Sequence, residues 1–181
     1  IQDSLVGSEM CIRDRNVMKG VSSSLKANEL GSLVGLTAEA SELNVLSGFT
    51  YVQQVSAAMD HTCALASNGF VKCWGRATSG RLGSGDEVNR GDDANEMGNN
   101  LAVVDLGTGK TAKQVVAGFE RTCAILNDDT LKCWGRNSLG QLGYGDTSDR
   151  GDGPNEMGDN LSVIDLGTGK TAKQVGIGEH H

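Results

Sequence analysis

Four cysteines are the residues of this 181-residue chain best suited to covalent chemistry. Cys63 and Cys73 lie ten residues apart, and Cys123 and Cys133 repeat that spacing. Residues 67–69 read Ser-Asn-Gly, a strong hairpin turn signal. If they form a three-residue loop, Cys63 faces Cys73 directly across two strands. We therefore expect a disulfide within each hairpin, contributing about 2 to 3 kcal/mol in the chain-entropy model.

Two alternatives remain for these cysteines. They could be reduced thiols packed as small hydrophobic groups, or ligands of zinc. A four-thiolate zinc site needs closely spaced pairs, whereas nine residues separate these cysteines and His61 is replaced by Arg121 in the second copy. The fifth cysteine, Cys11, lies far from both pairs. Pairing of the other four would indicate an oxidising compartment, and hence an extracellular or cell-surface protein.

Two acidic loops, residues 86–100 and 146–160, carry the candidate binding residues. Long loops on a rigid scaffold usually carry recognition, so we expect them to contact a protein partner. The candidates are Asp86, Arg90, Asp92, Glu96, Asp146, Arg150, Asp152 and Glu156. Carboxylates on glycine-rich loops could bind calcium, but the helix-loop-helix calcium spacing is absent, and we expect no metal. A merely solvated acidic loop is the simpler alternative.

Two short motifs suggest chemistry that their context does not support. Residues 107–111 read Gly-Thr-Gly-Lys-Thr, but a phosphate-binding loop needs a glycine where Val104 stands. Arg-Gly-Asp tripeptides occur at 90–92 and 150–152, at the same place in both copies, and are better explained as turns than as adhesion motifs. No catalytic set of side chains is recognisable. We expect no enzymatic activity and no cofactor.

These residues belong to a repeat of 60 residues. Residues 54–113 recur as 114–173 without insertion, with 35 of 60 positions identical, and a third copy begins at Gln174. Repeats of this length indicate stacked units that bury a shared core. We place repeat 1 at 51–113, repeat 2 at 114–173 and a truncated third at 174–181. The chain therefore reads as an excerpt of a longer protein.

The composition predicts an all-β fold, since aromatic residues make up 4% of the chain and glycines are frequent. In each copy we expect four strands. In the first they lie near residues 54–58, 62–66, 70–74 and 101–106.

The glycine-rich segment after the third strand resembles a known family. Residues 132–145 read Lys-Cys-Trp-Gly-Arg-Asn-Ser-Leu-Gly-Gln-Leu-Gly-Tyr-Gly, similar to the regulator of chromosome condensation repeat, and the resemblance covers 51–181. It implies a β-propeller, usually of seven blades with four strands each. Ala77 and Arg81 replace the usual Asn and Gln, which should weaken the first turn. An open solenoid or a sandwich is the alternative architecture.

Each turn should be built by residues that pack between neighbouring blades. These structural candidates are Trp74, Gly80, Leu82, Gly83, Trp134, Gly140, Leu142 and Gly143. We expect both tryptophans to be packing anchors rather than ligand stackers. Two isolated blades would leave strand edges exposed, which favours self-association and a low melting temperature.

The segment before the repeats has two parts. Residues 1–15 resemble a translated sequencing-library adaptor and are expected to be disordered. Residues 16–50 contain a 13-residue repeat, with Glu29-Leu30 over Glu42-Leu43. It resembles the Glu-Leu-Asn repeats of tail fibres, which implies a stalk. A short helical linker that docks on the first blade is the alternative.

The net charge of −7 argues against nucleic-acid binding, because an acidic chain repels phosphate. No apolar run is long enough to span a bilayer. We therefore interpret the chain as a fragment of a secreted or surface propeller that binds a protein through its blade loops. The first alternative is a guanine-nucleotide exchange factor for a small GTPase, which the family resemblance suggests. The second is a structural head or stalk in a surface or fibre assembly.

Overall fold

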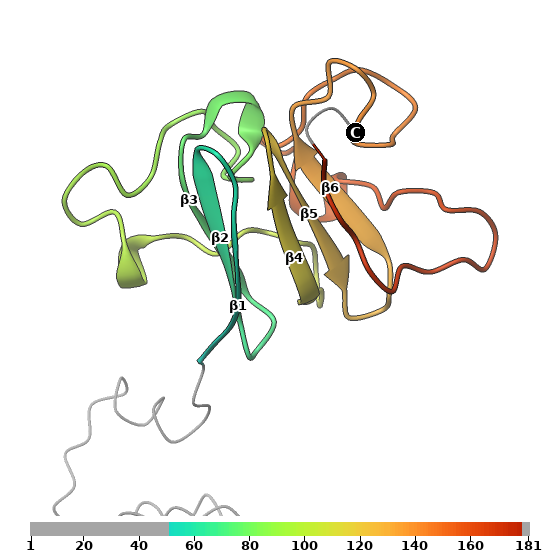
Figure 1. Ribbon diagram of the computed structural model, residues 1–181, viewed down its shortest axis with the longest axis horizontal. Coiled ribbons are helices and arrows are strands. Elements are labelled where there is room, and N and C mark those ends of the chain that lie inside the picture. The colour runs from blue at the N-terminus through green and yellow to red at the C-terminus, as the bar shows by residue number, and fades with distance from the viewer. Residues whose placement is uncertain (1–50, 179–181) are drawn as a thin grey trace, which may run out of the picture. The chain divides into compact units, whose positions relative to one another are not determined.

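The computed structural model describes residues 51–178, which fold into two similar antiparallel sheets (Figure 1). Strands β1 (Val52–Ala57), β2 (His61–Ala66) and β3 (Val71–Gly75) form the first sheet. Strands β4 (Ala112–Gly118), β5 (Arg121–Leu126) and β6 (Leu131–Gly135) form the second. The all-β prediction is confirmed for this part of the chain. The predictions for residues 1–50, including the adaptor and stalk segments, lie outside it.

The hairpin between β2 and β3 has the predicted register. Ala66 N–H donates to the carbonyl of Phe70 across a three-residue loop, and Gly69 takes a φ of 83°. The pairing then alternates along the strands, which makes Cys63 and Cys73 a non-hydrogen-bonded pair whose Cα atoms lie 4.1 Å apart. The two sulfurs lie at bonding distance, 2.11 Å apart.

The second hairpin repeats this geometry. Cys123 faces Cys133, with the sulfurs 1.98 Å apart. Asp129 adopts a φ of 65° where the first repeat has glycine, a conformation that Asp tolerates better than most residues.

The predicted fourth strand does not form, so each sheet has three strands and the expectation of four-stranded blades is wrong. Residues 101–106 run extended beside β3, where Val104 N–H donates to the Val71 carbonyl at 2.8 Å. Further along the same edge, Gly75 exchanges two hydrogen bonds with Arg90 instead. Because two separate segments share the outer edge of β3, neither forms a continuous ladder with it.

The two sheets pack face to face and bury a common core. Cys63, Leu65 and Val71 of the first sheet cluster with Val115 and Trp134 of the second. In a repeat architecture each unit covers its neighbour's apolar face. The exposed fractions of two equivalent side chains show this covering. Val115, which faces the first sheet, is 0% exposed, whereas its counterpart Val55 is 59% exposed.

The turn after β3 inserts between the sheets. Leu82 is buried in the shared core, and Gly83 lies directly against the indole of Trp134. A Cβ at Gly83 would come 2.8 Å from Trp134 Nε1, so this position accepts only glycine without movement. Trp134 is fully buried, while Trp74, which no repeat covers in this structure, is half-buried. Trp134 therefore lies in the shared core, and a packing role for Trp74 stays a prediction.

Candidate interaction surface

The first acidic loop is braced by hydrogen bonds within itself. The Glu96 carboxylate accepts from the backbone N–H groups of Gly91 (2.8 Å) and Asp93 (3.1 Å). Arg90 forms an ion pair with Asp86 at 2.8 Å and donates to the carbonyl of Val88. These contacts fix the turn that contains the Arg-Gly-Asp sequence, and they engage the arginine within its own loop.

The second acidic loop has the same bracing. Glu156 accepts from the N–H groups of Gly151 (2.9 Å) and Gly153 (3.0 Å), and Arg150 pairs with Asp146 at 2.7 Å. Six of the eight candidate residues therefore brace their own loops. Arg90 pairs with Asp86 and Arg150 with Asp146, while Glu96 and Glu156 accept hydrogen bonds from the backbone of the turns.

The two loops differ in exposure because only the second packs against another described repeat. Met97 is 42% exposed, whereas Met157 is 8% exposed. In the first loop Asp92 and Asp93 are exposed. Asp152, the counterpart of Asp92, is half-buried, and its burial, together with the hydrogen bond to Glu156, raises its pKa. The first loop is therefore the one in which both neighbouring carboxylates, Asp92 and Asp93, are exposed.

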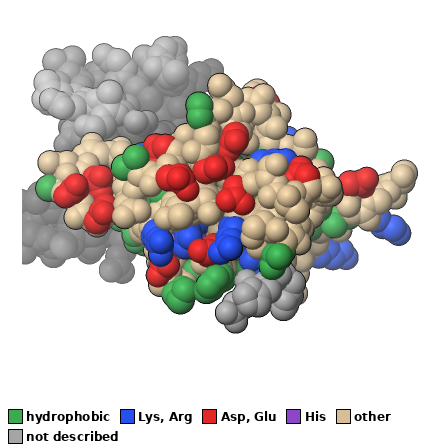
Figure 2. Space-filling view, turned by 90° about the horizontal axis from the view of Figure 1, so that it is seen from above, with side chains coloured by type: hydrophobic (Ala, Val, Ile, Leu, Met, Phe, Trp, Pro, Cys, Tyr) green, Lys and Arg blue, Asp and Glu red, His purple; other side chains and the backbone are tan. Residues whose placement is uncertain are grey.

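A second group of charges lies at the end of the sheets where the β1–β2 and β4–β5 turns meet, the end that Figure 2 views from above. The fully buried guanidinium of Arg81 lies 3.0 Å from Glu120 and 3.6 Å from Asp60. Arg136 also binds Glu120 and lowers its pKa. Arg81 thus joins the two repeats. The sequence showed only that an arginine replaces the glutamine usual in the family, which did not suggest this role.

Ala77 stands where the second repeat has an asparagine. In the second repeat the counterpart, Asn137, is fully buried and forms a set of side-chain hydrogen bonds. Its amide donates to the Asp146 backbone and carboxylate oxygens, both at 3.0 Å, and its carbonyl accepts from Leu142 N–H at 2.9 Å. Ala77 provides none of these bonds, so the first turn lacks this side-chain brace.

His61 is buried at the boundary between the repeats, and sequence reasoning gave it no such role. Thr122 Oγ1 donates to the Arg81 carbonyl at 2.9 Å, so the same oxygen must accept from His61 Nε2, also at 2.9 Å. The proton therefore sits on Nε2, and Nδ1 is buried without a partner. Burial and the nearby Arg81 lower the pKa of His61 from 6.5 to about 4, against the attraction of Asp60.

The Gly-Thr-Gly-Lys-Thr turn also contributes to the contact between repeats. Thr108 donates from its backbone N–H (2.8 Å) and from its hydroxyl (2.6 Å) to the Asp159 carboxylate. Lys132, buried beneath, donates to the carbonyls of Leu106 (3.0 Å) and Gly158 (2.8 Å). The motif is a turn that docks on the next repeat, as its context predicted.

Two features are absent from residues 51–178. No group of three or more potential ligand side chains could hold a metal ion there. Nor does that part of the chain contain a helix with the length and apolarity needed to cross a membrane.

The fold and the interface define a class: a protein built of sheet repeats in tandem, each with an intrasheet cysteine pair and a glycine-rich turn inserted between neighbours. Residues 112–141 match the family described as the regulator of chromosome condensation (RCC1) repeat. This segment of the chain is thus similar to the RCC1 repeat.

Curated relatives share parts of this chain. It is 34% identical over 109 residues to the ultraviolet-B receptor UVR8 of Arabidopsis thaliana, covering 60% of this chain and 23% of the receptor. Identity with the probable E3 ubiquitin-protein ligase HERC4 of Homo sapiens is 27% over 146 residues, covering 81% of this chain and 11% of the ligase. The chain therefore spans less than a quarter of these relatives.

Solved structures give a weaker likeness. Human WBSCR16 matches with a TM-score of 0.47 and 20% identity, covering 64% of this chain and 26% of that one. Prp20p of Saccharomyces cerevisiae matches with a TM-score of 0.46 and 18% identity, covering 65% and 26%.

Proposed function

We propose that the two repeats are neighbouring blades of a β-propeller that binds a protein partner through its acidic loops and performs no catalysis itself. The observation that carries this proposal is the first acidic loop, where Glu96 holds a rigid turn while Asp92 and Asp93 remain exposed. A preorganised loop loses little entropy on binding. Its exposed carboxylates favour a partner with a basic surface.

Photo-crosslinking tests the loop as the contact. A photoreactive residue at Ala94, an exposed position beside the two carboxylates, should give a protein adduct in extracts of the native source. A matched probe at Thr168, exposed in another turn, should not. The double variant Asp92→Asn, Asp93→Asn should lose the adduct. Equal adducts from both probe positions would refute the loop as the contact surface.

We also propose that the protein works outside the reducing interior of a cell, which separates it from a nuclear exchange factor. Two cysteine pairs at disulfide distance support this. Because all four cysteines are buried, alkylation of the folded protein cannot distinguish a bond from burial. The protein should instead be acid-quenched, denatured and alkylated with and without a reductant. Blocked cysteines released only by the reductant are expected, whereas free thiols would favour the intracellular alternative.

A further inference from the structure

In the second repeat, the ring of Tyr144 completes the outer edge of β6. Its hydroxyl accepts from the backbone N–H of Cys133 at 3.1 Å and donates to the carbonyl of the same residue at 3.0 Å. The ring packs against the buried cluster of Cys123, Cys133 and Leu142. The guanidinium carbon of Arg150 lies 5.6 Å from the ring centroid, within the range of a cation–π contact. One phenol ring therefore meets two backbone partners, a cation and an apolar wall.

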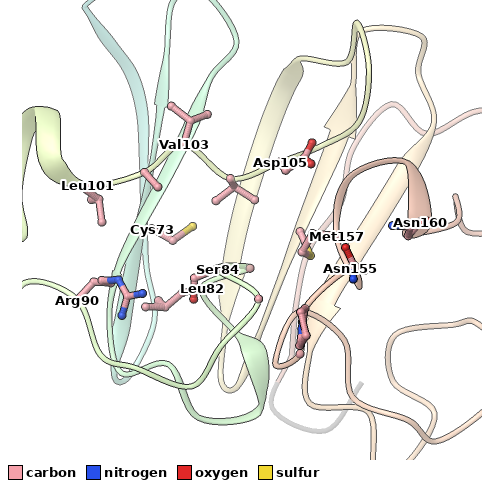
Figure 3. A pocket seen from close by; sticks show the side chains of 16 residues that line it. Cys73, Leu82, Ser84, Arg90, Leu101, Val103, Asp105, Asn155, Met157 and Asn160 are labelled. Atoms are coloured by element: carbon pink, nitrogen blue, oxygen red, sulfur yellow. The ribbon is translucent and has the colours of Figure 1, made fainter.

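The first repeat has Ser84 in place of this tyrosine. The Ser84 hydroxyl turns away and donates to Asp86 at 3.1 Å. A cavity of about 420 Å³ opens beside it, lined among others by Cys73, Leu82 and Arg90 (Figure 3).

The other parts of the tyrosine site are present around this cavity. Cys73 has the same register as Cys133, so its N–H and carbonyl also point away from β2, toward the cavity that it lines. Arg90 is held as Arg150 is held, by a carboxylate four residues earlier and by the carbonyls of the two preceding residues. Only the ring is missing.

The second repeat supplies a further wall. Residues 153–155 and Met157 face the segment 101–105 across the cavity, so the site lies between the repeats (Figure 3). Leu82, Val104 and Met157 give this space apolar walls, and polar residues such as Arg90, Asn155 and Asn160 line it as well. Such a mixture of apolar walls and a few polar groups is typical of ligand sites.

We propose that this cavity is a binding subsite for a phenol ring, filled by a tyrosine side chain of a partner polypeptide. The hydroxyl would pair with the backbone of Cys73 and the ring would lie beside Arg90, as Tyr144 does with Cys133 and Arg150. The source of the ring, a partner protein, rests on the proposed function. The chemistry of the site rests on the comparison of the two repeats.

Titration of the 181-residue chain with p-cresol, the tyrosine side chain as a free molecule, tests the chemistry. Amide NMR should show saturable shifts at Cys73 and in residues 101–105. Toluene, which has the ring without the hydroxyl, should bind at least about tenfold more weakly, because a buried polar site left unpaired disfavours the analogue. Equal affinity for both compounds would overturn the assigned role of the Cys73 backbone.

Two variants at one position provide the matched control. Ser84→Tyr should abolish p-cresol binding because its own ring occupies the cavity, whereas Ser84→Ala should leave the affinity unchanged. Should Ser84→Tyr fail to fold, Arg90→Gln serves instead, with an expected loss of about three- to tenfold from the missing cation. Undiminished binding by Ser84→Tyr, with the spectrum of the second repeat intact, would rule out the site.

N-acetyl-tyrosinamide distinguishes the source of the ring. Binding of this peptide-like compound as tight as that of p-cresol supports a tyrosine in a polypeptide. Binding of p-cresol alone overturns the partner source and indicates a small phenol. The Asp92→Asn, Asp93→Asn variant leaves this cavity intact, so loss of its crosslinked adduct and loss of p-cresol binding report on separate proposals.

Discussion

The side-chain amide of Gln54 pairs with the backbone of Val115 in the next repeat. Its nitrogen donates to the Val115 carbonyl at 2.7 Å and its oxygen accepts from the Val115 N–H at 3.2 Å. One of these two bonds recurs one repeat later, where Gln114 accepts from Val175 N–H at 3.3 Å. A side chain therefore takes the place that a neighbouring strand would occupy in a continuous sheet.

Removing this amide should weaken the contact between the sheets. Gln54→Ala leaves both backbone groups of the buried Val115 without a partner, so we expect the free energy of unfolding to fall by about 1 to 3 kcal/mol. Urea denaturation followed by circular dichroism measures this free energy of unfolding. Gln53→Ala, an exposed neighbour in the same strand, should change it by less than about 0.5 kcal/mol. Equal effects of the two substitutions would contradict the role of Gln54.

Protonation of His61 should destabilise the fold in acid. Its pKa is about 4 in the folded protein, below the value of 6.5 that an exposed histidine has, so between these values the unfolded chain binds more protons than the folded one. Stability is therefore lost as the pH falls from about 6.5 to about 4, by a total on the order of 3 kcal/mol.

Unfolding curves of the native protein and of His61→Gln, measured at pH 7 and pH 4, isolate this contribution from that of the carboxylates. The loss between the two pH values should be smaller in the variant, because Gln does not titrate. An NMR titration that gives the folded His61 an ordinary pKa near 6.5 would contradict the buried neutral state.

The turn of the second repeat should depend on Asn137. Replacing this buried residue with Ala removes three hydrogen bonds, and we expect a loss of about 2 to 3 kcal/mol in the free energy of unfolding. The reciprocal change, Ala77→Asn, should stabilise the first turn by about 1 kcal/mol, since Asp86 and Leu82 stand where the partners of Asn137 stand. A destabilising Ala77→Asn would mean that the first turn cannot accept the amide.

The cysteine pairs should stabilise each hairpin separately. The double substitution Cys63→Ser, Cys73→Ser should lower the free energy of unfolding by about 2 to 3 kcal/mol, because it frees a loop with a sequence separation of 10. Dithiothreitol, which reduces both pairs, should lower it by about twice that amount in the native protein and by about the amount of one pair in the variant. Identical unfolding of native and variant proteins under oxidising conditions would show that the pair contributes nothing.

The sequence was sufficient to predict the hairpins. The Ser-Asn-Gly loop and the cysteine spacing determine a single register, and the structure has that register. The prediction of a fourth strand was wrong because Arg90, fifteen residues after Gly75, forms backbone hydrogen bonds with the edge of β3. Residues 101–106 were expected to cover that edge, and nothing in the sequence indicates the competing contact.

Some residues of the contact between the repeats could have been predicted from the sequence, and others could not. Gln54 and Gln114 occupy equivalent positions in the two repeats, and Ser84 differs from Tyr144, so a closer comparison of the repeats could have pointed to both. The burial of His61 and the bridge from Arg81 to Glu120 could not be predicted, because they depend on how two sheets approach each other.

The pairing of Gln54 with the main chain of Val115 has an evolutionary consequence. The receiving strand contributes only backbone atoms, which every non-proline residue provides, so its side chains can diverge without losing this bond. This bond therefore needs no matched substitution in the neighbour when repeats are duplicated or recombined, unlike the pairs Arg81–Glu120 and His61–Thr122 at the same boundary.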